Sequence, residues 1–399
     1  MILIDPPAWP ARGRLWSHLV SDVSLAELHG FAADHGLPRR GFERDHYDVP
    51  ETAYAALVAA GAVPVSAREV VRRLRASGLR VPKKGSMGRR AAGRELLRPP
   101  RLRAGDLVAV VSMAGPVLAD RLAAGIARLH GWGLRVQPAP HVLDRDDRLD
   151  YLAADDAARA ADFTAAWLDP EVRAVVLARG GYGTDRALDR LDWRRLAEAE
   201  PKVVVGFSDV TALHQAIAQW LGLVTVHGHV VTSLGSAADS SAEALRLLLM
   251  EPDMVTDLFA GQAVAAVVGG AAEGVLVGGN LALLAAEVGT PSSRSAYGAI
   301  VVLEDVGEEP YRLDRMLTQL LRSGWFEGVR GVVLGAFVDC GDPAAVSATL
   351  FDRLVPLGVP MVTGVDLGHT DSTIAVPLGV RARLDADRTT LVLRAPPLT

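Results

Sequence analysis

Strands and helices alternate along the middle of this chain, and that alternation constrains its fold more than any other feature. Apolar runs typical of buried strands alternate with stretches that have the apolar spacing of amphipathic helices. The strand patterns occupy 106–112, 134–140, 172–181 and 203–209, and the helical patterns occupy 119–133, 155–169 and 211–222. This order predicts a parallel sheet with right-handed crossovers, in which ligands bind beyond the carboxyl ends of the strands.

Changes of pattern divide the rest of the chain. The stretch 81–98 is rich in Lys, Arg, Gly and Pro and has no apolar period, as expected of a linker. Before it, one short strand and three helical stretches predict a small α/β unit, and beyond about Glu251 shorter strands spaced by glycines predict a β-rich region. We therefore predict an α/β protein with a small α/β domain at 1–80, a basic linker at 81–98, an α/β lobe at 99–255 and a β-rich lobe at 270–399.

Charge and composition narrow the class of protein. With a formal net charge of -5, the chain lacks the excess of basic residues that binds a phosphate backbone, so we do not expect nucleic acid as a partner. One cysteine, Cys340, excludes an internal disulfide and fits a reducing compartment. The start MILIDPPAWP lacks the basic and apolar regions of a secretory signal, and no apolar run approaches the roughly 20 residues of a membrane span. We expect a cytoplasmic protein without a membrane partner.

A serine stands at the end of one predicted strand. In VVVGFSDVTALHQ the apolar run ends at Gly206 and Phe207, presents Ser208 and passes directly into a helix. A serine in such a turn projects its hydroxyl above the sheet edge, beside the free N–H groups of the helix start. The pattern resembles a nucleophile elbow, although Val210 replaces the second glycine of the α/β-hydrolase motif. An ordinary helix N-cap fits the same residues.

A glycine-rich turn follows the preceding strand at the same sheet edge. Arg179 is followed there by Gly180, Gly181, Tyr182 and Gly183, so a ligand can approach the backbone closely. The spacing of these glycines is neither a dinucleotide fingerprint nor a P-loop, so no bound nucleotide is expected. A tight strand-to-helix connection explains the glycines equally well.

Two later residues complete a set for nucleophilic catalysis if the chain order is serine, acid, histidine. Glu304 ends the strand pattern AIVVLE, and His369 lies in the loop LGHTDSTIAVPLG. Taken alone, the first also fits a solvated strand end and the second an exposed loop. His227 and His229, in VHGHV, suggest a metal site only weakly, because no third ligand is evident.

Five segments in order carry a resemblance to a known family. RGGYG, GFSDVTAL, GGNLALL, VVLEDVGEEPYRLDRMLTQL and GHTDSTIAVPLG resemble the serine peptidases that comprise murein tetrapeptide LD-carboxypeptidases and microcin C immunity hydrolases. The resemblance extends from about Pro99 to the end of the sequence. It implies two lobes: a parallel α/β sandwich that carries the nucleophile, and a β-rich C-terminal lobe that carries the acid and the base. It also implies a homodimer that needs neither a metal nor another cofactor.

The resemblance assigns roles residue by residue. Ser208 matches the nucleophile, Glu304 the acid and His369 the base, and the sequence keeps the family pattern at all three. The backbone N–H of Asp209 and a backbone N–H of the glycine turn would stabilise the oxyanion. Of the two candidate glycines, Gly181 is preferred to Gly180.

The implied substrate is an amide with an L centre on the acyl side. A murein tetrapeptide would release its terminal D-alanine in cell-wall recycling; alternatively, an immunity-type enzyme would cut an aminoacyl- or peptidyl-sulfamoyl-adenylate. Tyr311, Arg312 and Arg315 offer cations for a substrate carboxylate, although a surface ion pair also explains them. A protein that keeps the fold without turnover, and an α/β-hydrolase, are the competing interpretations.

The first 80 residues lie outside this resemblance and resemble a small bacterial domain of unknown function. They combine acidic, histidine and tryptophan side chains at a density that could bind a metal or a phosphate. Polar loop and capping residues are the alternative interpretation. The residues concerned are Asp5, Trp9, His18, Asp22, Asp45, His46 and Asp48.

Overall fold

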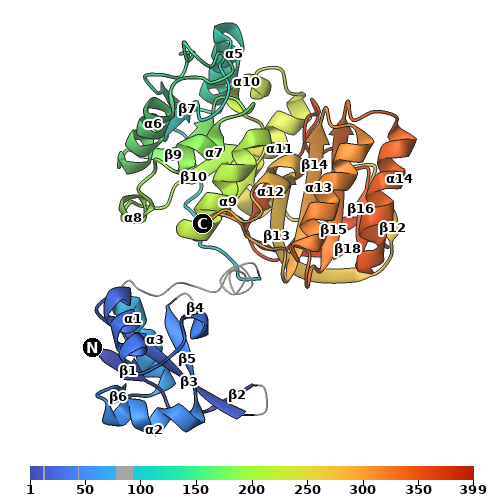
Figure 1. Ribbon diagram of the computed structural model, residues 1–399. Helices are drawn as coiled ribbons and strands as arrows, with labels where there is room; N and C mark the ends of the chain where they lie inside the picture. Colours follow the sequence, from blue (N-terminus) through green and yellow to red (C-terminus); the bar gives the residue numbers. More distant parts are fainter. Residues whose placement is uncertain (12–13, 44, 78–92) are drawn as a thin grey trace. The chain divides into compact units, whose positions relative to one another are not determined.

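The computed structural model describes residues 1–11, 14–43, 45–77 and 93–399 (Figure 1). It divides into two compact units, Met1–Met87 and Gly88–Thr399. Most of the predicted linker at 81–98 lies outside the described residues. Among the described residues, no helix combines the length and the apolar character that crossing a membrane requires.

Among its described residues, the N-terminal unit has a mixed sheet and three α-helices. The sheet order is β4-β5-β3-β1-β6, with β2 paired to β3. Its strands β1 to β6 are Ile2–Ile4, Trp9–Ala11, Arg14–Ser21, Phe42–Glu43, His46–Pro50 and Val63–Pro64, and its helices α1 to α3 are Leu25–Asp34, Glu51–Ala59 and Ala67–Ala76. Strand β1 is buried on both faces: Ile2 and Ile4 face one apolar cluster while Leu3 faces the other. The predicted small α/β domain is therefore present.

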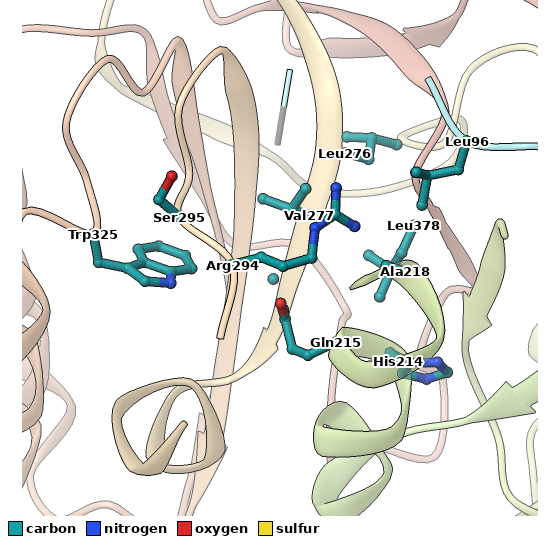
Figure 2. A pocket seen from close by; sticks show the side chains of 12 residues that line it. Leu96, His214, Gln215, Ala218, Leu276, Val277, Arg294, Ser295, Trp325 and Leu378 are labelled. Atoms are coloured by element: carbon teal, nitrogen blue, oxygen red, sulfur yellow. The ribbon is translucent and has the colours of Figure 1, made fainter. Parts of the chain in front are cut away.

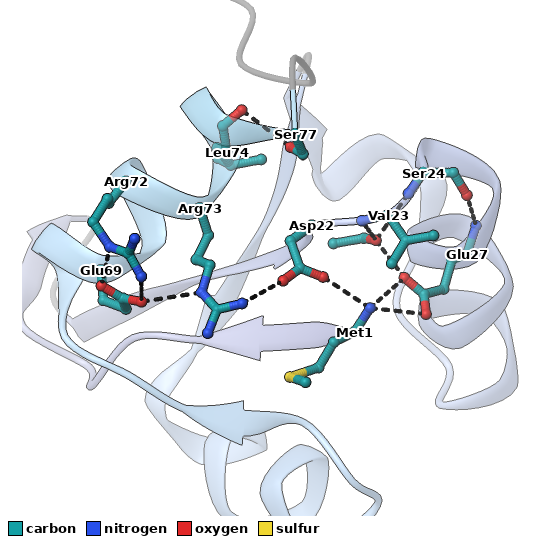
Figure 3. A network of polar contacts seen from close by, with 11 residues as sticks. Met1, Asp22, Val23, Ser24, Glu27, Glu69, Arg72, Arg73, Leu74 and Ser77 are labelled. Carbon is teal, nitrogen blue, oxygen red and sulfur yellow. Dashed lines mark hydrogen bonds and ion pairs between the residues drawn. The ribbon is translucent and has the colours of Figure 1, made fainter.

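A polar network ties the strand ends of this unit to its helices (Figure 3). The Met1 ammonium lies 3.0 Å from Asp22 and 3.0 Å from Glu27 at the start of α1. Asp22 also pairs with Arg73 of α3, at 3.1 Å, and Arg73 pairs with Glu69. Asp22 thus belongs to this network and not to the histidine cluster with which the sequence grouped it.

The first lobe of the larger unit is a doubly wound sheet in the order β17-β11-β10-β9-β7-β8. Five of these strands are parallel, with the 2-1-3-4-5 order of flavodoxin-like folds, and β17 joins antiparallel. Helices α6 and α9 cover one face, and α5, α10 and α11 cover the other (Figure 1). The strands β7 to β11 are Leu107–Val111, Arg135–Pro138, Val172–Leu177, Val203–Gly206 and Thr225–His227, and the helices α5 to α11 are Ala119–Gly131, Asp156–Leu168, Thr184–Leu188, Trp193–Leu196, Thr211–Trp220, Val231–Leu234 and Asp239–Met250.

The second lobe is built on a seven-stranded sheet in the order β12-β16-β15-β14-β13-β18-β19. Helices α12, α13 and α14 pack on one face of it, and a second apolar cluster that includes β17 lies on the other. The strands β12 to β19 are Ala265–Val268, Ala271–Asn280, Ala299–Val306, Gly331–Val338, Met361–Thr363, Val376–Leu378, Arg381–Asp385 and Thr390–Leu393, and the helices are Leu281–Ala286, Pro310–Arg322 and Pro343–Leu354. The predicted two-lobed α/β architecture is confirmed, although the second lobe carries more helix than its glycine-spaced strands suggested.

Candidate active site

Ser208 follows β10 in a backbone conformation that side chains rarely adopt. Its φ of 65° is left-handed, and a 3-10 turn, Ser208–Val210, leads from it into α9. A Cβ atom at Gly206 would lie 2.9 Å from the side chain of Val210, so the glycine leaves room for the valine that replaces the second glycine of the hydrolase motif. The strained turn is what a nucleophile elbow requires, and a simple helix N-cap would not need it.

The three residues singled out for a triad meet across the two lobes. Nε2 of His369 lies 3.0 Å from Oγ of Ser208, and Nδ1 lies 2.8 Å from Oε2 of Glu304. Glu304 lies in the buried part of β14, while His369 lies in the loop before β17. The geometry is that of a nucleophile, a base and an orienting acid.

Glu304 is buried, and its contact with His369 is made by one carboxylate oxygen. The Glu304 side chain is fully buried, and among the described residues its second oxygen, Oε1, has no hydrogen-bond partner. The Phe207 ring, 4.8 Å from the imidazole between centroids, covers one side of His369. Gly368, with a φ of 113°, lets the backbone before His369 pass close to the Glu304 carboxylate, since a Cβ at this position would lie 2.5 Å from Oε2 of Glu304.

The glycine turn borders the serine, as its position in the sequence suggested. A Cβ at Gly180 would lie 2.9 Å from Cβ and 3.1 Å from Oγ of Ser208. The Gly180 carbonyl accepts a hydrogen bond from the N–H of Gly115, at 3.1 Å, which joins the turns after β9 and β7. These turns flank the switch point of the sheet, where ligands bind in doubly wound folds.

The side chain of Asp209 connects the serine turn to the glycine turn. Its buried carboxylate accepts a hydrogen bond from the N–H of Thr184, at 2.8 Å, at the start of α7. Burial raises the pKa of this carboxyl group. The sequence assigned only the backbone N–H of Asp209 a role, so this connection is an additional finding.

Arg159 is a site-forming residue that the sequence analysis missed. Its fully buried guanidinium, on α6, donates to the carbonyl oxygens of Met113 and Gly183 and thereby holds the loops after β7 and β9 together. An arginine on the same helical face as Phe163 and Trp167 was the available signal.

Three further histidines of the first lobe, His214, His227 and His229, are buried. His214 bonds the carbonyl oxygen of Gly206 at 2.8 Å, and His229 contacts two serine hydroxyls. Burial lowers the pKa of His214 to about 4, that of His227 to about 3 and that of His229 to about 4, so all three are neutral near pH 7. None of them belongs to a group of potential metal ligands among the described residues.

The basic residues after Glu304 lie at the surface. Arg312 pairs with Glu308, at 3.6 Å, and both Arg312 and Arg315 lie over the ring of Tyr311. Of the two interpretations that the sequence allowed for these residues, the structure therefore agrees with the surface ion pair.

A small cavity lies between α9 and β13, lined by His214 and Gln215 on one side and Val277 and Arg294 on the other (Figure 2). Its volume of about 20 Å³ suits one water molecule. It is therefore too small to be the substrate site.

Comparison with known families matches three parts of the chain. Residues 108–228 match the LD-carboxypeptidase N-terminal domain, and residues 273–384 match the LD-carboxypeptidase C-terminal domain. Residues 2–77 match a protein family of unknown function, DUF4031.

Individual relatives agree with these matches. A putative carboxypeptidase of Streptomyces coelicolor is 52% identical over 76% of this chain and 98% of its own length. The murein tetrapeptide carboxypeptidase of Pseudomonas aeruginosa is 35% identical over 70% of this chain and 94% of its own length. Among solved structures, the microcin C7 self immunity protein in complex with aspartyl sulfamoyl adenosine shares the fold, with a TM-score of 0.67 over 76% of this chain and all of that one, at 21% identity.

Proposed function

Because this chain belongs to the LD-carboxypeptidase family, we propose that it hydrolyses the L,D amide bond of murein tetrapeptides and releases their terminal D-alanine. The single observation that carries the proposal is the continuous contact from Ser208 through His369 to Glu304 within a chain of this family. Two relatives support this substrate class: the murein tetrapeptide carboxypeptidase of Pseudomonas aeruginosa, at 35% identity, and a protein of Bacillus subtilis named as a probable murein peptide carboxypeptidase, at 34% identity.

The proposed mechanism uses Ser208 as the nucleophile. His369 takes the proton from Oγ through Nε2 while Oγ attacks the carbonyl carbon of the L residue. The same proton then passes to the leaving amine of D-alanine, and an acyl-enzyme ester remains. Water, deprotonated by His369, attacks the carbonyl carbon of the ester. The bond between that carbon and Oγ of Ser208 breaks, His369 gives the proton to Oγ, and the shortened peptide leaves with a new carboxylate. Glu304 keeps the proton of Nδ1 in place and stabilises the imidazolium.

The proposed oxyanion hole combines two backbone N–H groups. The N–H of Asp209 follows the nucleophile directly, as in other elbow-type sites. The second donor would come from the glycine turn, where Gly180 packs against Ser208 and Gly181 follows it in a left-handed conformation. Each such donor contributes about 10² to 10³ in kcat.

The test is release of D-alanine from a murein tetrapeptide by the purified full-length protein. Ser208→Ala is expected to lower kcat by at least about 10⁴-fold, because it removes the group that forms the ester. Ser236→Ala, at an exposed serine of the same lobe, is the matched control and is expected to keep full activity. A tetrapeptide that ends in L-alanine should not be cleaved.

The same assay distinguishes the immunity-type alternative. The microcin immunity protein shares the fold at 21% identity, which does not extend its substrate to this chain. If the protein cleaves an aminoacyl-sulfamoyl-adenylate and releases no D-alanine from the tetrapeptide, the immunity-type substrate is correct and the proposed murein substrate is wrong. Equal activity of Ser208→Ala and the unaltered protein would refute the triad itself.

We further propose that the enzyme is a cytoplasmic homodimer that needs no metal for catalysis. The family resemblance supports the dimer, and the single, buried Cys340 fits a reducing compartment. Light scattering of the eluted protein should give twice the chain mass of 42.2 kDa, and cell fractionation should recover the protein in the cytoplasm. D-alanine release should persist in the presence of a chelator.

A further inference from the structure

The N-terminal unit gathers two histidines and an aspartate on one face of its sheet. His18 lies on β3 directly opposite Asp48 on the antiparallel strand β5. His46 precedes Asp48 by two residues on β5, so the alternation of side chains places both on the same face. One ligand atom from each of His18, His46 and Asp48 lies within 4.8 Å of the other two.

Buried carboxylates set the orientation of both imidazole rings. Nδ1 of His18 lies 3.0 Å from Asp5, and Nδ1 of His46 lies 2.6 Å from Asp45. Asp5 and Asp45 are 1% and 2% exposed, so each carboxylate is held where it accepts the Nδ1 proton. The Nε2 atom of each ring then keeps a lone pair, which is the state that a metal requires.

Further contacts fix Asp5 in this position. It accepts hydrogen bonds from the backbone N–H of His18, at 2.5 Å, and from Nε1 of Trp9, at 3.2 Å. The Trp9 ring also packs edge-on against His18, with 5.3 Å between the ring centroids. Three of the residues that the sequence grouped with these histidines, Asp5, Trp9 and Asp45, thus hold His18 and His46 in position.

The spacing of the ligand atoms suits a small cation. Nε2 of His46 lies 3.4 Å from Oδ1 of Asp48. Tetrahedral ligands with metal bonds of about 2.0 to 2.1 Å are separated by about 3.3 to 3.4 Å. The side chain of His18 is 29% exposed and that of Asp48 is 42% exposed, so an ion can reach the cluster from solvent.

We propose that His18, His46 and Asp48 bind a divalent transition-metal ion of the Zn²⁺ type. Two imidazole nitrogens and one carboxylate oxygen fill three positions, and water or a ligand fills the fourth. Imidazole donors favour Zn²⁺, Co²⁺ or Ni²⁺ over Mg²⁺ and Ca²⁺, which prefer oxygen ligands. The ion belongs to the N-terminal unit and is independent of the proposed carboxypeptidase reaction.

The experiment uses the full-length protein, stripped with a chelator and then titrated with Co²⁺ and Zn²⁺. One equivalent of Co²⁺ should bind with the intense visible absorption of a four-coordinate site, and Zn²⁺ should displace it. Elemental analysis after gel filtration should give one Zn²⁺ per chain. Mg²⁺ should not displace the Co²⁺.

Paired variants separate the cluster from other surface groups. His18→Asn and Asp48→Asn should abolish the absorption and weaken binding at least about 100-fold. His35→Asn and Asp34→Asn, which change an exposed histidine and an exposed aspartate of the same unit, should leave both unchanged. Asp5→Asn should weaken binding by about 10- to 100-fold, because it loosens the ring of His18 without removing a ligand.

Two results would overturn the proposal: no Co²⁺ spectrum with the unaltered protein, or the same affinity in the cluster variants and their controls. Circular dichroism is recorded on every variant. Asp48→Asn changes a half-exposed side chain, so it tests the site even if a histidine variant fails to fold.

Discussion

At the scale of single residues, the site depends on side chains and glycines in tight contact. Ser208 is one of three described residues other than glycine with a positive φ, and it contacts His369, the proposed base, directly. Backbone strain at a reactive residue is characteristic of functional sites, where surrounding structure maintains a conformation that the residue alone disfavours.

That strain predicts a difference in stability between two inactive variants. Ser208→Gly should be more stable to unfolding than Ser208→Ala by about 1 kcal/mol, because only glycine adopts a left-handed φ without a Cβ penalty. Both variants should lack activity. Urea denaturation of the two variants measures the difference, and equal stability would show that the turn relaxes in solution.

Gly180 should be intolerant of even one methyl group. In Gly180→Ala the new Cβ would lie 3.1 Å from Oγ of Ser208, where substrate and nucleophile must meet. We expect kcat/KM to fall at least about 100-fold, comparable to the loss of an oxyanion donor. The melting temperature should fall as well, because the new Cβ would lie only 2.9 Å from Cβ of Ser208. Gly131→Ala, in α5 with no neighbour within 4 Å of the new Cβ, is the control; a similar loss there would remove the steric explanation.

At the scale of elements, two carboxyl groups meet where α7 of the first lobe approaches the end of α12 in the second. Burial, followed by the charges of Glu287 and Asp209, raises the pKa of Asp185 from 3.8 to about 7. Glu287 also accepts hydrogen bonds from Thr290 and Ser292. Asp185 is therefore largely protonated below pH 7 and can donate a hydrogen bond to Glu287.

This raised pKa predicts how stability depends on pH. Between about pH 4 and 7 the folded state holds a proton on Asp185 that the unfolded state has lost, so its contribution to stability decreases as the pH rises. Asp185→Asn removes that dependence. Its melting temperature relative to the unaltered protein should rise from pH 5 to pH 8.

Asp147→Asn, at an exposed aspartate of the same lobe, is the matched control and should show no such trend. A constant difference between Asp185→Asn and the unaltered protein across the pH range would contradict the shifted pKa.

The elements themselves were predictable where the apolar period was regular. Strands β7, β9 and β10 and helices α5, α6 and α9 lie within the predicted segments, because buried parallel strands and amphipathic helices have distinct patterns. Strands β3 and β5 were not predicted. Their mixed polar and apolar residues include His18 and His46, whose positions depend on cross-strand contacts.

At the scale of the whole molecule, the proposed amide hydrolysis and the proposed metal binding belong to separate units. The triad lies within Gly88–Thr399, and the proposed metal ligands lie within Met1–Met87. Ser208→Ala should therefore bind Co²⁺ as tightly as the unaltered protein, and His18→Asn should release D-alanine at an unaltered rate. Measuring both activities on both variants tests this separation; loss of D-alanine release in His18→Asn would show that the units are coupled.

The sequence by itself determined the fold class and the family, because ordered motifs and apolar periods are local properties of the chain. It also singled out Ser208, Glu304 and His369 as the candidate triad. Only the tertiary structure decided which side chains meet. Ser208 and His369 are 161 residues apart, and their contact depends on how the two lobes pack against each other. Likewise, the polar residues of the first 80 became a cluster of His18, His46 and Asp48, with Asp22 elsewhere, because strand register determines which side chains share a face.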